Sequence, residues 1–296
     1  MLKAFAHKGL FHFVLLVAWI AIGTALRFTN LTAKSPWADE FATLVFSIGN
    51  SFDTVPLDRA IFLDTLLMPL KPVPGADFGA VFHNLMTQST HPPVYFMLNH
   101  LWMQLFPLED GLASLWAARS LSAIFGVASI PAIFGLGWLA FRSRLVGQIA
   151  AAMMAVSPYG IYQAQEPRHY TLAILLIIAS LSCSVIAARS IRDRTFLPIW
   201  VGLIWVVVNS LGIAVHYFFA LTLCAEALVL IVLVWRHRRK GVQGRWGDKG
   251  TRGQGEIIVV YFPPSPHPPL LGEAHLWRLF AVAAGTLVGG GIWLPA

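Results

Sequence analysis

Residues 196–235 read FLPIWVGLIWVVVNSLGIAVHYFFALTLCAEALVLIVLVW, and these 40 residues contain a single charged side chain, Glu226. About 20 apolar residues cross a bilayer as an α-helix, so this stretch is long enough for two crossings. The segment Asn209–Gly212 near its middle is polar and contains a glycine, which predicts a tight turn between two helices. The stretch therefore predicts a helical hairpin embedded in a membrane.

Five further apolar segments surround this hairpin, and each has about the length of a membrane crossing. Hydrophobic residues make up 57% of the chain and charged residues 12%, whereas a soluble domain is typically about one quarter charged. The N-terminal segment has no small-residue cleavage site followed by a soluble domain, so it predicts an uncleaved first span. The pattern predicts an all-α polytopic membrane protein with about seven transmembrane helices, the single spans being Leu10–Arg27, Leu115–Phe141, Val146–Tyr162, Tyr170–Ala188 and Leu276–Leu294.

The net charge of +7 comes from short basic segments between the apolar stretches. The densest of them, Arg236-His237-Arg238-Arg239-Lys240, follows the hairpin directly. Basic clusters beside membrane helices set orientation and contact anionic head groups, so we expect membrane lipids and no nucleic acid as partners. Cys183 and Cys224 lie inside apolar stretches and are expected to be small buried hydrophobic residues, with no disulfide framework and no cysteine metal site.

Lysine and arginine are distributed unevenly between the two sides of the predicted spans. If the N-terminus is cytoplasmic, the short inside segments hold 14 of the 21 lysine and arginine residues. The predicted outside loop, residues 28–114, holds only Lys34, Arg59 and Lys71. By the positive-inside rule, this distribution predicts a multi-pass protein of the plasma (inner) membrane with a cytoplasmic N-terminus and a large first outside loop.

Two segments near the end of the chain are not typical of a transmembrane helix. Arg236–Gly255 is basic and rich in glycine, which favours a mobile inside loop. Tyr261–Leu271 contains five prolines and is not expected to form a regular helix. We therefore predict a transmembrane module over residues 1–235, an inside loop over 236–275 and a last helix over 276–296.

The outside loop is too apolar for a disordered linker. Phe41–Ile48 and Ala60–Leu67 carry apolar residues at helical spacing, which predicts short helices lying along the membrane surface. Asp39 and Glu40 immediately precede the first of these helices. Either the two carboxylates only complement the positive end of the helix dipole, or one is a general base and the other its orienting partner.

A second motif, His91-Pro92-Pro93-Val94-Tyr95, lies near the end of the same loop. The two prolines favour an extended segment followed by a new helix, which fixes the direction of His91 and Tyr95. One interpretation is a rigid turn at a helix start, and the other is a ligand-binding role for these two side chains.

A third polar segment, residues 157–170, follows the third predicted span. Ionisable groups at membrane depth are costly and usually functional, and an arginine there can grip a phosphate with paired N–H donors. Alternatively, a Glu166–Arg168 pair only fastens the helix ends. His216, at the outside end of the hairpin, is expected to be structural. The third segment contains Ser157-Pro158-Tyr159, Tyr162, Gln165-Glu166-Pro167-Arg168-His169 and Tyr170.

The three motifs, taken in order, resemble a known family. An outside Asp-Glu, then His-Pro-Pro-x-Tyr, then Ser-Pro…Gln-Glu-x-Arg-x-Tyr-x-Leu is similar to the GT-C glycosyltransferases. The closest branch is glycosyltransferase family 39, with its protein O-mannosyltransferases and the aminoarabinose transferases of lipid A. The resemblance covers roughly residues 1–235. It implies a GT-C-like bundle and an inverting transfer of a sugar from a polyprenyl-phosphate carrier to a lipid, glycan or protein acceptor on the non-cytoplasmic face.

The resemblance also implies roles for individual residues. Asp39 would be the catalytic base, with Glu40 beside it. Arg168 would bind the carrier phosphate, and His91 and Tyr95 would line the sugar or acceptor cavity. The remaining substrate-binding residues implied by the resemblance are Tyr162, Gln165, Glu166 and Tyr170, of which Glu166 and Tyr170 would organise their loop.

No obligatory metal or other cofactor is expected, because no His/Asp cluster has metal-ligand spacing and Arg168 stands where metal-using GT-C members tend to have a second acid. The family usually continues through several more spans, so the chain resembles a C-terminally truncated member. The alternatives are a transporter or lipid-carrier flippase and a catalytically silent membrane subunit. Ionisable residues inside the spans would favour a transporter, and Glu226 is the clear exception to their scarcity here.

Overall fold

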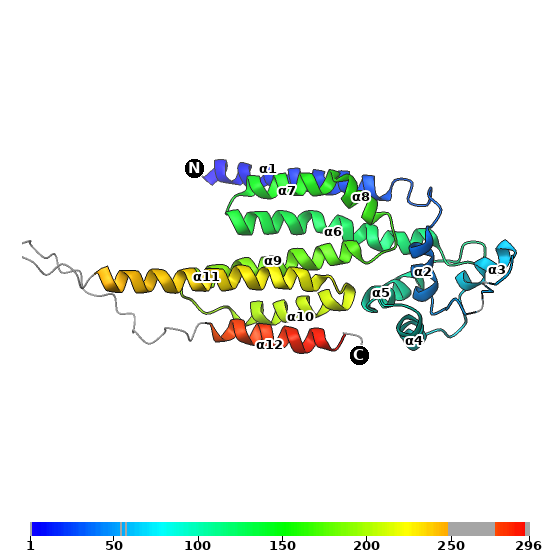
Figure 1. The fold of residues 1–296 in the computed structure, drawn as a ribbon. Helices are drawn as coiled ribbons and strands as arrows, with labels where there is room; N and C mark the ends of the chain where they lie inside the picture. The colour runs from blue at the N-terminus through cyan, green and yellow to red at the C-terminus, as the bar shows by residue number, and fades with distance from the viewer. Residues whose placement is uncertain (1, 54, 57, 248–275, 294–296) are drawn as a thin grey trace, which may run out of the picture.

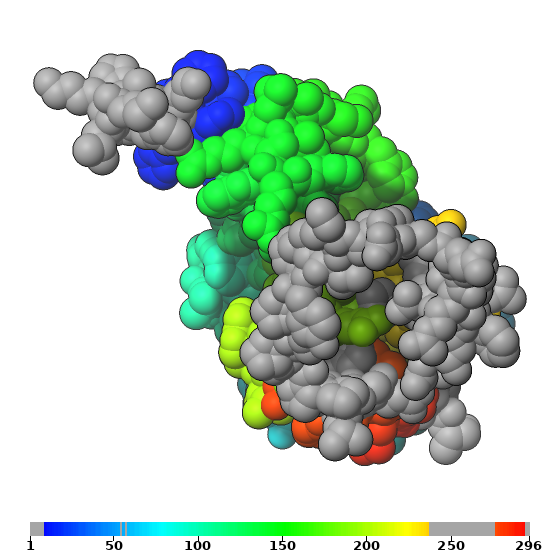
Figure 2. All heavy atoms as spheres, turned by 90° about the vertical axis from the view of Figure 1, so that its left-hand side faces the viewer, coloured from blue at the N-terminus to red at the C-terminus, as the bar shows by residue number. Residues whose placement is uncertain are grey.

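The computed structural model describes residues 2–293 except 54, 57 and 248–275, and these residues form twelve α-helices, one short 3-10 helix and no strand. One set of helices runs side by side and is called the bundle, and a second set gathers at one end of it and is called the cap (Figure 1). Figure 2 shows the molecule from the bundle end opposite the cap. The bundle contains α1 (Leu2–Phe28), α6 (Leu115–Phe141), α7 (Arg144–Val156), α8 (Pro158–Ala164), α9 (Tyr170–Arg192), α10 (Ile199–Val215), α11 (Phe219–Gly247) and α12 (Trp277–Gly291).

The bundle has the dimensions and the surface of a membrane protein. Four helices of the described residues are long and apolar enough to cross a membrane, or five if α7 and α8 form one bent span. Large apolar side chains such as Phe13, Leu145 and Leu203 are 63–64% exposed, which is typical of a lipid-facing surface. The expected all-α membrane character is confirmed. The expected count of about seven crossings stays a prediction, because it also requires α10 and α12, which are shorter at 17 and 15 residues.

The apolar hairpin forms, but its turn lies at residues 216–218 and not at Asn209–Gly212. Asn209 lies inside α10 because its amide has partners on two neighbouring helices. It accepts a hydrogen bond from Ser180 Oγ of α9 at 2.8 Å and donates one to Thr286 Oγ1 of α12 at 3.3 Å. The predicted position of the turn is therefore wrong, since this polar residue points into the bundle and does not end a helix.

The third expected span is broken between α7 and α8, which meet at an angle of 58°. Ser157 caps α8, and Pro158 takes its first position, where the missing N–H of proline has no helical partner to lose. The break leaves the last carbonyls of α7 without helical partners. Arg27, buried at the end of α1, donates to two of them, Met154 O at 2.8 Å and Ala155 O at 3.0 Å.

The basic segment after the hairpin differs in part from the expected loop. α11 continues to Gly247, so the segment's first residues are helical, and arginine and lysine are compatible with this because both are good helix formers. The rest of the predicted inside loop, including Tyr261–Leu271, lies outside the described residues. The expected last helix corresponds to α12.

Residues 28–114, the predicted outside loop, fold into the cap. Its helices include the one expected at Phe41–Ile48, a shorter form of the one expected at Ala60–Leu67, the one expected after His91-Pro92-Pro93, and one more that was not expected. Its elements are α2 (Ala38–Ser47), α3 (Leu63–Leu67), the 3-10 helix η1 (Met68–Leu70), α4 (Phe78–Gln88) and α5 (Val94–Met103). Two side chains of α5 hold the end of α2: Asn99 Nδ2 donates to Ser47 Oγ at 3.1 Å, and His100 Nδ1 lies 2.8 Å from Ser47 O. These bonds fix the direction of α2 and thereby the position of Asp39 at its start.

Candidate functional site

The three sequence motifs meet at the cap end of the bundle (Figure 1). Asp39 and Glu40 lie in the first turn of α2, His91 precedes α5, and residues 165–169 connect α8 to α9. Successive bundle helices run in opposite directions, so the 165–169 connector and the 216–218 turn lie at the same end as the cap. Residues more than a hundred positions apart in the chain are consequently in contact.

Asp39, His91 and Arg168 form one connected group. We use the name charged cluster for these three residues together with the neighbouring His169 and His216. Arg168 Nη2 lies 3.4 Å from Asp39 Oδ2 and 3.4 Å from His91 Nε2, and Nη1 donates to the Asp39 carbonyl at 3.2 Å. The side chain of Arg168 is 4% exposed and that of Asp39 is 48% exposed. The Asp39 carboxylate is therefore the member of the pair that a substrate can reach directly.

The guanidinium of Arg168 is not fully paired. Nη1 lies 3.3 Å from Thr43 Oγ1, but Nε is buried and has no hydrogen-bond partner among the described residues. A buried polar group without a partner costs about 1–3 kcal/mol. An unpaired donor such as Arg168 Nε therefore calls for an explanation, and a bound ligand that accepts its hydrogen bond would be one.

Three histidines lie close together in the charged cluster. The ring centroid of His169 is 4.5 Å from that of His216 and 5.8 Å from that of His91. Burial, followed by His216, Arg168 and His91, lowers the pKa of His169 to about 2. Burial and Arg168 lower the pKa of His91, against an opposing effect of Asp39, and burial, His91 and Arg168 lower the pKa of His216. All three imidazoles are therefore neutral at pH 7.

A neutral His91 has a defined orientation of its proton. Because a guanidinium only donates, His91 Nε2 is the acceptor toward Arg168, and the proton sits on Nδ1. Nδ1 lies 2.9 Å from Ser89 Oγ, so the Nδ1–H can donate its hydrogen bond to this hydroxyl. α5 begins at Val94, directly after the two prolines, so the motif does form the expected helix start that directs His91 toward the cluster.

Tyr95 and Tyr170 lie behind and beside Arg168. Tyr95 is fully buried, and its hydroxyl is 2.7 Å from Ser122 Oγ, which donates to the Arg168 carbonyl at 3.0 Å. Tyr95 therefore holds the 165–169 connector and lines no open cavity in this structure. The guanidinium carbon of Arg168 is 5.5 Å from the centroid of the Tyr170 ring, close enough for a cation–π contact.

A cavity of about 200 Å³ opens beside the start of α2, and we call it the tyrosine pocket. Lys34 Nζ lies 4.8 Å from the centroid of the Tyr162 ring, and Gln165 donates to the carbonyls of Leu26 and Thr29 at the end of α1. The lining includes four of the residues singled out in the sequence, and it consists of Lys34, Ser35, Trp37, Glu40, Arg119, Tyr162, Gln165 and Glu166.

Glu40 is paired with Arg119 of α6, a residue that sequence reasoning missed. Arg119 Nη2 donates to Glu40 Oε2 at 2.7 Å and Nε donates to Oε1 at 3.2 Å, and the two side chains are 3% and 1% exposed. Arg119 also donates to the carbonyls of Leu31 and Lys34. Glu40 thus ties the segment before α2 to the bundle, whereas its neighbour Asp39 faces solvent. The one available signal for Arg119 was its charge in the second turn of an otherwise apolar span.

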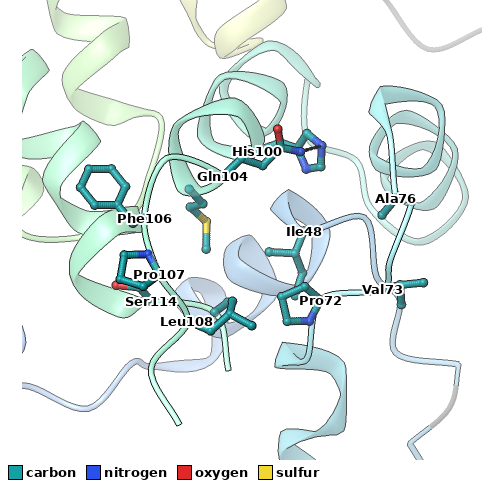
Figure 3. Close-up of a pocket in the computed structure, with 13 residues that line it drawn as sticks. Ile48, Pro72, Val73, Ala76, His100, Gln104, Phe106, Pro107, Leu108 and Ser114 are labelled. Atoms are coloured by element: carbon teal, nitrogen blue, oxygen red, sulfur yellow. Dashed lines mark hydrogen bonds between the residues drawn. The ribbon is translucent and has the colours of Figure 1, made fainter. Parts of the chain in front are cut away.

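A second cavity, of about 290 Å³, lies within the cap at the other end of α2 (Figure 3). Ile48 and Phe106 contribute apolar walls, and Gln104 Nε2 lies 2.8 Å from His100 Nε2. No acidic side chain, lysine or arginine is among the described residues that line it. This cavity lies at the opposite end of α2 from Asp39. It is therefore separate from the charged cluster, which lies at the start of α2.

The site joins apolar membrane helices to a polar group of residues that includes a half-exposed carboxylate and a buried guanidinium. Within the described part of the chain, no group of three or more His, Cys, Asp or Glu residues is arranged to hold a metal ion. No family model, no curated protein and no solved structure matches this chain. The class that the fold defines is an all-α membrane protein, and its site is interpreted below from geometry and chemistry.

Proposed function

We propose that this protein is a glycosyltransferase that moves a sugar from a polyprenyl-phosphate carrier to an acceptor hydroxyl, with inversion. The observation that carries the proposal is the half-exposed Asp39 carboxylate, held by buried Arg168 at one end of an apolar helical bundle. The resemblance of the three ordered motifs to the GT-C glycosyltransferases supports it. A carrier with a lipid tail explains why such a site would lie where membrane helices end.

Asp39 acts as the general base in this proposal. The acceptor oxygen attacks C1 of the sugar from the face opposite the phosphate, and its proton passes to an Asp39 carboxylate oxygen. The bond between C1 and the phosphate oxygen breaks, and its electron pair leaves with polyprenyl phosphate. A positioned base of this kind contributes about 10²- to 10⁴-fold to the rate, because an acceptor hydroxyl is a poor nucleophile.

Arg168 stabilises the negative charge that the leaving phosphate gains. A fixed guanidinium in a water-poor site has its largest effect when charge develops as the bond breaks. The Nε of Arg168 has no partner among the described residues, but the side chain is 4% exposed, so a phosphate oxygen would reach it only after the neighbouring side chains move apart. Lys34 adds a second positive charge at the rim of the tyrosine pocket, where Tyr162 and Gln165 contribute further polar contacts.

The proposed orientation places the cap outside and the N-terminus in the cytoplasm. Basic residues of the 142–144 and 189–194 segments lie at the bundle end opposite the cap (Figure 1), as the positive-inside rule requires for a cytoplasmic face. In this proposal α10 and α12 complete seven crossings, and α7 with α8 forms one bent crossing. The acceptor is a lipid, glycan or protein on the outer face of the plasma (inner) membrane.

The test is transfer of label from a radiolabelled polyprenyl-phosphate sugar in membranes that contain the protein. We expect Asp39→Asn to lower transfer by at least about 10²-fold, since the amide cannot take the proton. Asp77→Asn is the matched control, because Asp77 is an exposed helix cap and asparagine caps equally well. Undiminished transfer by membrane-inserted Asp39→Asn protein would refute the proposed base.

A further inference from the structure

Polar side chains from four bundle helices meet about 15 Å from the charged cluster, since Ser180 lies ten residues into α9. Glu226 of α11 is the only acidic residue of the 40-residue hairpin and is 5% exposed. We call this group the polar layer. All of its members are buried, and they are Ser180 of α9, Trp205 and Asn209 of α10, Glu226 of α11 and Thr286 of α12.

Ser180 is the centre of the polar layer. Its Oγ lies 3.0 Å from Glu226 Oε2 and 2.8 Å from Asn209 Oδ1, and it accepts a hydrogen bond from Trp205 Nε1 at 2.9 Å. The Asn209 amide continues the network, because its Nδ2 donates to Thr286 Oγ1 at 3.3 Å. The contacts therefore form one connected path across four helices.

Which of these hydrogen bonds can form together depends on whether Glu226 is ionised or protonated. A serine hydroxyl carries one proton, so Ser180 cannot donate to Asn209 Oδ1 and to an ionised Glu226 at the same time. If Glu226 is protonated on Oε2, it donates to Ser180, and Ser180 donates to Asn209. The hydroxyl then makes one donation and accepts two hydrogen bonds, from Glu226 and Trp205, which uses its full capacity.

The surroundings of Glu226 contain no charge to balance a carboxylate. No ion pair among the described residues includes Glu226. The titratable side chain that interacts with it is Cys183 of α9, while α10 and α12 contribute the neutral Trp205, Asn209 and Thr286. An isolated carboxylate in an apolar interior is strongly disfavoured, and such a group normally takes up a proton. Its second oxygen, Oε1, is buried without a partner, and this costs less for a neutral acid than for a carboxylate.

We propose that Glu226 is a proton-binding site in the middle of the bundle, protonated at pH 7 and donating to Ser180. Its proton completes the directed path from Glu226 through Ser180 and Asn209 to Thr286. Loss of the proton at alkaline pH would place an unbalanced charge between four helices and loosen their packing. This site does not depend on the proposed transferase reaction.

The direct test is infrared difference spectroscopy of the purified protein in lipid, comparing wild type with Glu226→Gln. We expect the C=O band of a protonated carboxylic acid at pH 7 in the wild type and its absence in the variant. A carboxylate band at Glu226 at pH 7 would overturn the proposal. Sodium added at constant pH should leave the acid band in place, and its loss would show that an alkali cation, not a proton, neutralises the site.

A second variant tests the hydrogen bond even if Glu226→Gln does not fold. Ser180→Ala removes the acceptor and keeps Glu226, so the acid C=O band should remain and shift in frequency. An unshifted band would contradict the path through Ser180. Where Glu226→Gln folds, its thermal midpoint should stay near that of the wild type and lose its dependence on alkaline pH, because the glutamine amide can donate to Ser180 as the acid does.

Discussion

Replacing Glu40 by glutamine tests whether its buried pair with Arg119 holds Asp39 in place. Arg119 makes four hydrogen bonds, two of which go to the Glu40 carboxylate. Glutamine has nearly the same size as glutamate but carries no charge and offers an amide N–H₂ that opposes the guanidinium donors. The substitution therefore leaves the positive charge of Arg119 buried and without its counter-ion.

The expected loss follows from the burial of the pair. Removing one partner of a buried ion pair costs about 3–5 kcal/mol of unfolding free energy, because the remaining charge is uncompensated. Solvent screening is small here, since the two side chains are 3% and 1% exposed. The carbonyls of Leu31 and Lys34 keep their bonds to Arg119 and offset part of the loss. We expect a value at the lower end of that range, about 3 kcal/mol.

The assay is chemical or thermal unfolding of the purified protein in lipid discs, with Glu40→Gln, Arg119→Gln and the double variant. The double variant should lose less stability than the sum of the two single losses by more than about 1 kcal/mol, since the residues interact directly. Asp64→Asn, at an exposed carboxylate of the cap, is the control and should change stability little. Strict additivity of the two single losses would refute the reasoning, as would wild-type stability of Glu40→Gln.

Three further predictions concern the charged cluster and the topology. Polyprenyl-phosphate binding should fall more in Arg168→Ala than in Arg168→Lys, which keeps the charge but loses the planar fork; equal binding by all three forms would count against a phosphate role. Lowering the pH from 7 to 5 should cost roughly 2 kcal/mol of unfolding free energy through His169, because unfolded histidine, with a pKa of 6.5, binds a proton that the folded residue, with a pKa of about 2, does not. This stability is present above pH 6.5 and is lost as the pH falls toward 2, so His169→Gln should flatten the measured pH dependence, and an unchanged slope would contradict the assignment. A reporter fused after Tyr95 should be found outside and one fused after Lys240 inside, and the reverse result would overturn the topology.

The membrane helices were predictable because apolar length is almost sufficient to specify a crossing. The position of the hairpin turn was not predictable in the same way. Asn209 looks like a turn residue in sequence, but Ser180 and Thr286 satisfy its amide within the bundle. The break at Ser157 and Pro158 is a local signal of a helix start, which the apolar length of the surrounding segment obscured.

The gathering of the three motifs at one end of the bundle was easier to predict than the contacts between them. Alternating spans place alternate connectors at one end, so Asp39, His91 and Arg168 were expected on one face, and the structure brings them into contact. Pairing depends on packing between distant segments, which a single sequence does not specify. For this reason the partner of Glu40 and the full burial of Tyr95 emerged only from the structure.

The most direct test of the central claim is release of polyprenyl phosphate from a synthetic polyprenyl-phosphate sugar by the purified protein in liposomes. Release reports the broken bond between sugar and phosphate, and a mixture of membrane lipid, glycan and protein supplied as acceptors removes the need to know the acceptor in advance. The account predicts release by the wild type and by Asp77→Asn, and a loss of at least about 10²-fold in Asp39→Asn. Equal release by wild type and Asp39→Asn, or none by wild type with total membrane lipid, glycan and protein acceptors supplied, would contradict it.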